Sequence, residues 1–205
     1  MFTLVVALSI LYIILGSIGM TVNLCVTLLI CFSSKFKNPT YTYIVNHLVS
    51  DMLCLFPISI YTGFCMLIGE KYLERLMSVL VDLGWYPSGF FYICIAATRV
   101  TAIGSKTRLE ETLTKKATIV TISIIWIPYI IITGGYMFND QKPSGLDFRV
   151  YTWWYDTDVA YGYYMNIYYA YHGIFTSILI VILNIIAIAL MRQKLRNIHP
   201  NVQST

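Results

Sequence analysis

The chain has 205 residues, of which 58% are hydrophobic and only 12% are charged, with a formal net charge of +4. Because soluble domains carry about 25% charged residues, this composition excludes a soluble enzyme, and the mean hydropathy of +0.68 excludes a disordered chain. The small, scattered net charge also excludes a nucleic-acid-binding protein. The composition is that of a membrane protein.

Five long apolar segments make up most of the chain. In chain order, they are predicted to span the membrane at residues 3–32, 40–68, 76–104, 117–138 and 162–191. Each reaches the roughly 20 residues that a helix needs to cross a bilayer core of about 30 Å. Segments of this length without alternation of period two indicate helices, which satisfy their own backbone hydrogen bonds in lipid. We predict an all-α membrane protein with five transmembrane helices in a single domain, 1–205.

The basic residues lie in alternate connections. The first and third connections and the C-terminal tail contain nine basic and two acidic residues, whereas the second and fourth connections contain four basic and six acidic residues. The positive-inside rule therefore predicts that the N-terminus lies outside and the C-terminus in the cytosol. The first segment has no basic region before its apolar run, so we interpret it as an uncleaved helix rather than a signal peptide. We expect a multi-pass protein of the plasma membrane, or one retained in the endoplasmic reticulum.

Three polar residues are predicted to lie within the membrane. A charge at the bilayer centre costs about 2.5–3.5 kcal/mol on insertion scales, so it is a functional candidate by default. Asp51, near the middle of the second segment, either joins helices or forms an ion or proton site. Asn23, at a similar depth, either packs helices together or shares a polar cluster with Asp51. Arg99, near the inner end of the third segment, either extends to lipid headgroups or contacts a cytosolic partner.

Candidate ligand contacts lie towards the outer ends of the third and fifth segments. Asp82 is either an exposed, inert acid or a contact for a cationic ligand. Four tyrosines of the fifth segment fall on one helical face, at Tyr161, Tyr164, Tyr168 and Tyr171. With the neighbouring His172, this face either lines an outer ligand cavity or forms an interfacial aromatic belt.

No enzyme or metal centre is predicted. His47 and Asp51 share a helical face that suits metal or proton chemistry, but His172 and His199 lie on other segments and at other depths. No Ser, His and Asp lie at one membrane level. All five cysteines fall within the apolar segments, so no structural disulfide is expected. We expect no catalytic residue, cofactor or metal.

Four motifs, in order along the chain, resemble those of the rhodopsin-like seven-helix G-protein-coupled receptors. Asn23 matches the Asn of helix one, and residues 46–51 (Asn-His-Leu-Val-Ser-Asp) followed by Pro57 resemble the Asn-Leu-Ala-x-Ala-Asp pattern of helix two. Residues 98–100 (Thr-Arg-Val) resemble the Asp-Arg-Tyr motif that ends helix three, and Trp126 matches the Trp of helix four. The degenerate third motif and the Tyr-rich fifth segment are most similar to the nematode serpentine receptors, class x, a chemosensory group.

The resemblance implies a function and partners. Arg99 would hold the inactive state and then contact a heterotrimeric G protein, with Thr98 beside it, while Asn23 and Asp51 would belong to a polar network that often houses sodium. An unknown small-molecule or peptide ligand would enter among the outer halves of helices three to five. The candidate contacts there are Asp82, Tyr164, Tyr168, Tyr171 and His172. Membrane lipid and a second receptor copy are the other expected partners, and nucleic acid is not.

The chain also departs from the family pattern. Thr98 replaces the acidic partner of the motif's Arg, and residues 71–75 (Lys-Tyr-Leu-Glu-Arg) lack the Cys that would tether helix three to the outer loop. The fifth segment lacks its usual Pro, and Asp82 is one residue, about 100°, away from the Asp that amine receptors use. Helices six and seven are absent from the 205 residues, so we expect that the chain does not signal alone.

Two other functions stay open from the sequence. One is a five-helix membrane fragment that binds other receptors and alters their export. The other is a small proton-coupled carrier built around Asp51, favoured only by the acid within the membrane.

Overall fold

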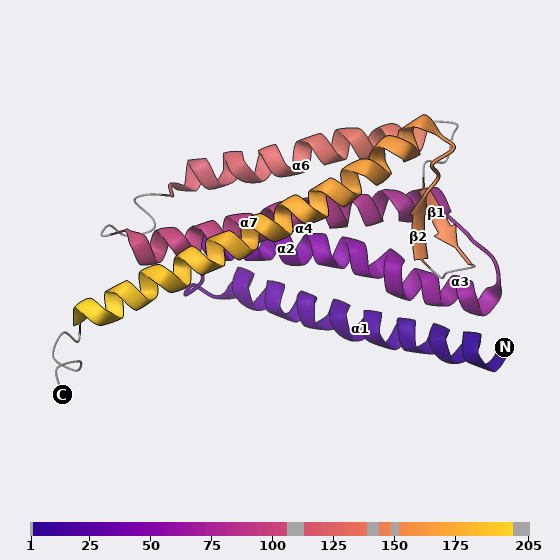
Figure 1. Ribbon diagram of the computed structural model, residues 1–205. Coiled ribbons are helices and arrows are strands. Elements are labelled where there is room, and N and C mark those ends of the chain that lie inside the picture. The colour runs from indigo at the N-terminus through magenta and orange to yellow at the C-terminus, as the bar shows by residue number, and fades with distance from the viewer. Residues whose placement is uncertain (1, 106–112, 139–143, 149–151, 199–205) are drawn as a thin grey trace.

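The computed structural model describes residues 2–105, 113–138, 144–148 and 152–198. In this part of the chain, five helical segments are long and apolar enough to cross a membrane, and they lie alongside one another as a bundle (Figure 1). In chain order, the elements are α1 (Phe2–Phe32), α2 (Pro39–Leu55), the π-helix η1 (Phe56–Tyr61), α3 (Thr62–Ile68), α4 (Glu74–Gly104), α6 (Lys115–Phe138), β1 (Ser144–Asp147), β2 (Thr152–Tyr155) and α7 (Ala160–Ile198). The structure thus has the predicted all-helical class, with a two-stranded hairpin that was not predicted.

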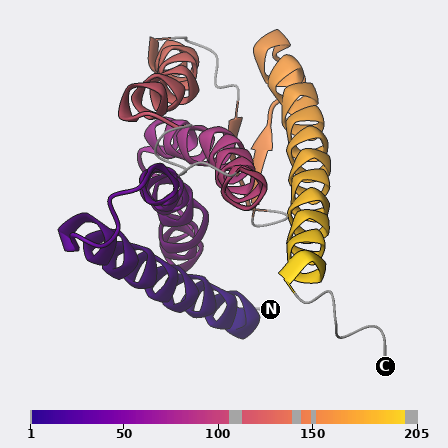
Figure 2. The same cartoon turned by 90° about the vertical axis from the view of Figure 1, so that its left-hand side faces the viewer.

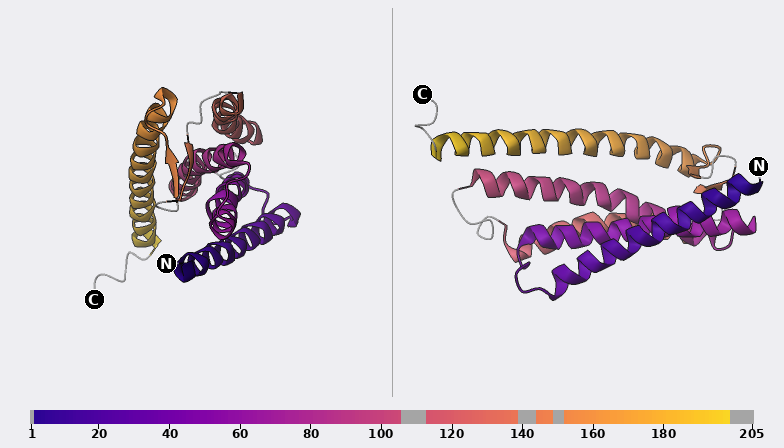
Figure 3. Two further views of the ribbon diagram at one scale, coloured as in Figure 1. Left: turned by 90° about the vertical axis from the view of Figure 1, so that its right-hand side faces the viewer. Right: turned by 90° about the horizontal axis from the view of Figure 1, so that it is seen from below.

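Helix α4 is the centre of the bundle. It contacts α2, α6 and α7, whereas α1 packs on the other side of α2 and its continuation into α3 (Figures 2 and 3). Gly84 allows the close approach of α4 to α2, because a Cβ atom there would lie 2.5 Å from the backbone nitrogen of Cys54. Apolar faces of both helices also meet α6 through Tyr43, Phe91, Ile95 and Ile125. Helix α4 is therefore the element that holds α2, α6 and α7 together.

The second membrane span contains a wide turn that the sequence analysis did not predict. Pro57 has no backbone N–H to donate to an earlier carbonyl, and residues 56–61 around it form the π-helix η1. The hydroxyl of Thr62 donates to the carbonyl oxygen of Pro57 at 2.8 Å, which satisfies one of the acceptors that the turn exposes. The span then ends at Gly69, whose positive φ of 79° suits a residue without a side chain.

A short antiparallel hairpin covers one end of the bundle. Its strands pair Leu146 with Trp153 and Gly145 with Trp154, and it lies beside the start of α4 at the same end as the N-terminus (Figure 1). Aromatic side chains of β2 favour the strand conformation, although four residues are too few to show an alternating pattern. The C-terminal end of α7 lies at the opposite end of the bundle (Figure 1).

Candidate functional site

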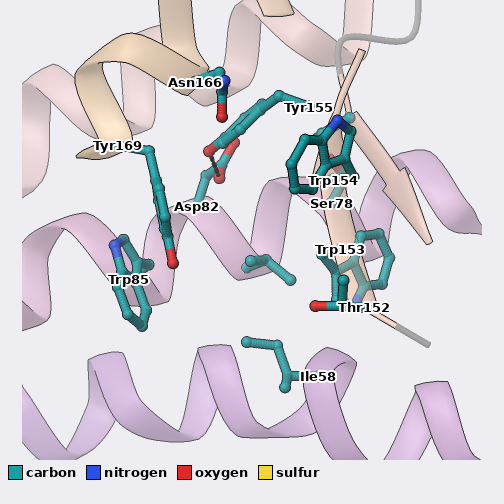
Figure 4. Close-up of a pocket in the computed structure, with 12 residues that line it drawn as sticks. Ile58, Ser78, Asp82, Trp85, Thr152, Trp153, Trp154, Tyr155, Asn166 and Tyr169 are labelled. Carbon is teal, nitrogen blue, oxygen red and sulfur yellow. Dashed lines mark hydrogen bonds between the residues drawn. The ribbon is translucent and has the colours of Figure 1, made fainter. Parts of the chain in front are cut away.

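A cavity of about 260 Å³ lies between the hairpin, α4, α7 and η1 (Figure 4). Five aromatic side chains and one carboxylate form much of its lining, from Asp82, Trp85, Trp153, Trp154, Tyr155 and Tyr169. The Trp85 and Tyr169 rings stack with their centroids 5.2 Å apart, which joins α4 to α7 at one wall. Asn166 adds an amide from α7. The cavity is therefore mostly apolar with a few polar groups, the usual character of a small-molecule site.

The carboxylate of the cavity is held by hydroxyl groups. Tyr155 donates to Oδ1 of Asp82 at 2.5 Å, and the hydroxyls of Tyr155 and Tyr86 lie 2.9 Å apart. All three side chains are buried, with Asp82 only 3% exposed. Burial, and next the negative charge of Asp82, raise the pKa of Tyr155 above its ordinary value. Tyr155 therefore keeps its proton and serves as the donor to the carboxylate.

Polar contacts fasten the hairpin to the start of α4. Glu74 accepts a hydrogen bond from the backbone N–H of Leu146 at 2.9 Å, and Lys71 donates to the carbonyl oxygen of the same residue. Lys71 and Glu74 also form an ion pair of 3.3 Å. The side chain of Leu146, 1% exposed, packs against Cys65 and Met77. All five cysteines are free, so the attachment is non-covalent.

Of the five residues predicted to form a ligand cavity, the structure places only Asp82 on this cavity. Tyr164 and Tyr171 are 69% and 70% exposed, on the face of α7 turned away from α4. The hydroxyl of Tyr168 is bonded instead to that of Tyr129 on α6, at 2.6 Å. His172 is 5% exposed and packs against other rings rather than the cavity.

The other four residues fall outside this cavity for a simple geometric reason. Helix α7 turns Met165, Asn166 and Tyr169 towards the site, a face adjacent to the predicted tyrosine stripe. Tyrosines occur all around this part of α7, so their spacing does not identify the inward face. Asp82 is the residue by which the sequence indicated this site, whereas Trp85 and the aromatic residues of β2 were not predicted to line it.

Deeper in the bundle, a second polar cluster joins α2 to α4. His47 Nε2 lies 3.2 Å from Oδ2 of Asp51, and the hydroxyl of Ser88 donates to Oδ1 of Asp51 at 3.0 Å. The same hydroxyl is 3.0 Å from Nδ1 of His47. Within the described part of the chain, no hydrogen bond joins Asn23 to Asp51. Among the described residues, Asp51 therefore contacts His47 and Ser88, and its sharing of a polar network with Asn23 stays a prediction.

The end of α4 opposite the hairpin contains the predicted contact residues Thr98 and Arg99. Thr98 is 2% exposed and donates to the carbonyl oxygen of Ile95 at 2.8 Å, within its own helix. Arg99 is exposed, and no ion pair of Arg99 is found among the described residues. Thr98 therefore provides no ionic restraint on its neighbour.

Comparison with known proteins identifies the family. The model of the family described as serpentine type 7TM GPCR chemoreceptor Srx matches residues 13–205. The chain belongs to this Srx family. The predicted resemblance to rhodopsin-like receptors of the class-x branch is thereby confirmed. Members of this family are receptors rather than enzymes, and the Srx chain is accordingly a multi-pass membrane protein of the receptor class.

Two individual proteins are similar to the chain, one in sequence and one in fold. The Srx chain is 32% identical to human CX3C chemokine receptor 1 over 145 residues, which cover 68% of the chain and 40% of that receptor. Its fold matches the crystal structure of squid rhodopsin with a TM-score of 0.76 at 13% identity, over 96% of the chain and 55% of rhodopsin. The chain thus spans about half the length of these receptors or less.

Proposed function

We propose that this Srx-family chain senses a chemical signal by binding a compact ligand in the cavity beneath the hairpin. The observation that carries the proposal is the Asp82 carboxylate, 3% exposed, in the wall of a cavity whose other walls are largely aromatic. A buried negative charge favours a cation, and aromatic faces attract cations through their ring quadrupoles. The favoured ligand is therefore a small aromatic amine or another ammonium compound.

The charge-based orientation supports this assignment. With the N-terminus outside, the hairpin end of the bundle faces the exterior, where a chemosensory receptor meets its ligand. The opposite end then lies in the cytosol, and we propose that Arg99 contacts the G protein there. In this arrangement the ligand contacts α4 at one end, and the G protein contacts the same helix at the other.

Tryptophan fluorescence tests the ligand site. Three of the four tryptophans line the cavity, so their emission reports binding there, while Trp126 lies on α6. The probes are phenethylammonium and the neutral phenethyl alcohol, titrated into the purified chain in detergent micelles. We expect the cation to act at an about tenfold lower concentration, equivalent to ~1.4 kcal/mol.

Two matched variants show whether this preference depends on Asp82. Asp82→Asn retains an acceptor for Tyr155 but removes the charge, and it should make the two probes equally weak. Asp156→Asn removes an exposed acid at the same end of the bundle and should leave the preference intact. A preference for the cation that persists in Asp82→Asn would contradict the proposed site.

A further inference from the structure

A second concave site lies at the end of the bundle opposite the hairpin. It is a groove of about 590 Å³ where α2 and α6 begin, and the two helices are in contact with each other. Lys37, Pro39 and Thr42 line it from the side of α2. Leu113, Lys115 and Ile119 line it from the side of α6. Each wall of the groove therefore combines one lysine with apolar atoms.

The charge of this groove is not neutralised by the surrounding described residues. Among them, no acidic side chain lines the groove, and neither Lys37 nor Lys115 takes part in an ion pair. Lys37 lies just before α2 and Lys115 is the first residue of α6, so they approach a common ligand from two sides. Such an arrangement favours an anion with several acceptor oxygens, and a phosphate group has this chemistry.

The lysine side chains provide this attraction, rather than the free backbone N–H groups of the two helix starts. Asn38 caps α2 by accepting from the N–H of Tyr41 at 3.3 Å, and Thr114 caps α6 by accepting from the N–H of Ala117 at 3.2 Å. Both caps engage part of the backbone that would otherwise attract an anion. The ammonium groups of Lys37 and Lys115 are then the main determinants of binding, and substituting them is a direct test.

The apolar part of the groove distinguishes a lipid from free phosphate. From Ile119, which is 55% exposed, an apolar face of α6 continues through Ile124 and Ile127, at 66% and 53% exposed. A lipid acyl chain can lie along this face while its headgroup contacts the lysines. Lys115 is the first residue of its membrane span and Lys37 lies two residues before its own, which is the depth of lipid headgroups.

We propose that this groove binds the phosphate headgroup of an anionic lipid. The positive-inside rule puts this end of the bundle in the cytosolic leaflet, where anionic lipids are concentrated. Basic pockets between transmembrane helices on that side bind phosphate-bearing headgroups. The site is separate from the ligand cavity and does not depend on the function proposed for it.

The test uses the full chain in detergent micelles with a fluorescent phosphatidic acid, and with phosphatidylcholine of the same chain length as the neutral lipid. Lys37→Ala combined with Lys115→Ala removes both charges of the groove. The matched control combines Lys35→Ala with Lys116→Ala, because these two lysines are exposed neighbours that do not line the groove. Replacing Lys37 and Lys115 by Arg keeps the charge and serves as the rescue. Circular dichroism and size-exclusion profiles verify that all variants are folded.

The affinities of the variants for the two lipids distinguish the groove from the general basic charge of this end. We expect the wild type to bind phosphatidic acid in preference to phosphatidylcholine. Lys37→Ala combined with Lys115→Ala should lower the affinity for phosphatidic acid at least about tenfold. The control pair at Lys35 and Lys116 and the two Arg replacements should each change this affinity about twofold or less. An equal loss in the two alanine pairs would overturn the proposal, since binding would then reflect the general basic charge of this end. Displacement by inorganic phosphate at the concentration of the lipid would likewise overturn it, because the acyl chain would contribute nothing.

Discussion

Removing one hydroxyl, that of Tyr155, is expected to destabilise the hairpin end of the bundle. In Tyr155→Phe the ring stays in place, but Asp82 loses the donor at 2.5 Å and Tyr86 loses the hydroxyl at 2.9 Å. Both side chains are buried, at 3% and 0% exposed, so each depends on the fold for its hydrogen-bond partner. A buried polar group that loses its partner costs about 1–3 kcal/mol, and more when it is charged. We expect a total loss of ~2–3 kcal/mol.

Thermal unfolding in detergent micelles, followed by circular dichroism, measures this loss. For chains of about this length, 1 kcal/mol corresponds to roughly 2–4 °C, so Tyr155→Phe should lower the melting temperature by about 5–10 °C. Tyr164→Phe removes a hydroxyl from a side chain that is 69% exposed, and it should lower the melting temperature by less than about 2 °C. Equal melting temperatures of Tyr155→Phe and the wild type would refute the argument that this hydroxyl supports the carboxylate.

The pH dependence adds a second check on the same residue. Because burial and Asp82 raise the pKa of Tyr155, the folded protein keeps this proton above pH 10, whereas the unfolded chain loses it near its ordinary pKa of about 10. The contribution of the Tyr155 hydroxyl to the free energy of unfolding is therefore complete below about pH 10. As the pH rises further, this contribution falls by about 1.4 kcal/mol per pH unit. Tyr155→Phe lacks this loss, so the difference in stability between the two proteins should narrow above pH 10 and stay constant below it.

Three further predictions address the hairpin, the packing of α4 and the end of α4 opposite the hairpin. Cys65 is 1% exposed beneath the hairpin, and its thiol can be labelled in a chain that keeps only this cysteine. In that chain, Glu74→Ala should speed labelling about tenfold, whereas Glu74→Gln, which retains an acceptor, should speed it less. Equal labelling rates in the unsubstituted chain and both variants would exclude Glu74 as an anchor of the hairpin. Gly84→Ala places a Cβ 2.5 Å from the backbone nitrogen of Cys54 and should lower the free energy of unfolding by ~2–4 kcal/mol. Gly134→Ala, where a Cβ has no neighbour within 4 Å, should leave the free energy of unfolding unchanged or raise it by up to about 1 kcal/mol. In a chain extended by helices six and seven of an Srx receptor, Arg99→Ala should leave membrane insertion unchanged and abolish G-protein activation, and equal activation in the two chains would exclude that role.

Hydropathy predicted the membrane helices because it depends on local composition alone. The segments between charged connections are long and apolar, and each became a helix in the bundle. The hairpin was missed for the opposite reason. Its strands are four residues each, and they are stabilised by Lys71 and Glu74, which lie more than 70 positions away from Leu146 in the sequence. No pattern within the strand itself contains that contact.

For the polar residues within the membrane, the sequence predicted contacts within one helix but not contacts between helices. The spacing of His47 and Asp51 predicts a shared helical face, and Nε2 of His47 does lie 3.2 Å from Oδ2 of Asp51. Their third partner, Ser88, comes from α4, and its identity depends on how α4 is rotated against α2. Periodicity gives the faces of one helix but not the rotation of two helices against each other. For the same reason, depth alone left Asn23 open between helix packing and a cluster shared with Asp51, and no hydrogen bond among the described residues joins the two.

The non-covalent attachment of the hairpin has a consequence for access to the cavity. A disulfide holds a loop in place until the covalent bond is reduced, whereas the contacts of Lys71 and Glu74 with Leu146 break and re-form without chemistry. Since the hairpin supplies three aromatic rings of the cavity wall, its local opening exposes the cavity, and ligand binding should stabilise the closed hairpin. Phenethylammonium should then slow the labelling of Cys65 in the chain that keeps only this cysteine, and Asp82→Asn should abolish the protection. Protection that is equal with phenethyl alcohol would mean that the hairpin closes over any apolar probe and that the carboxylate has no part in selecting the ligand.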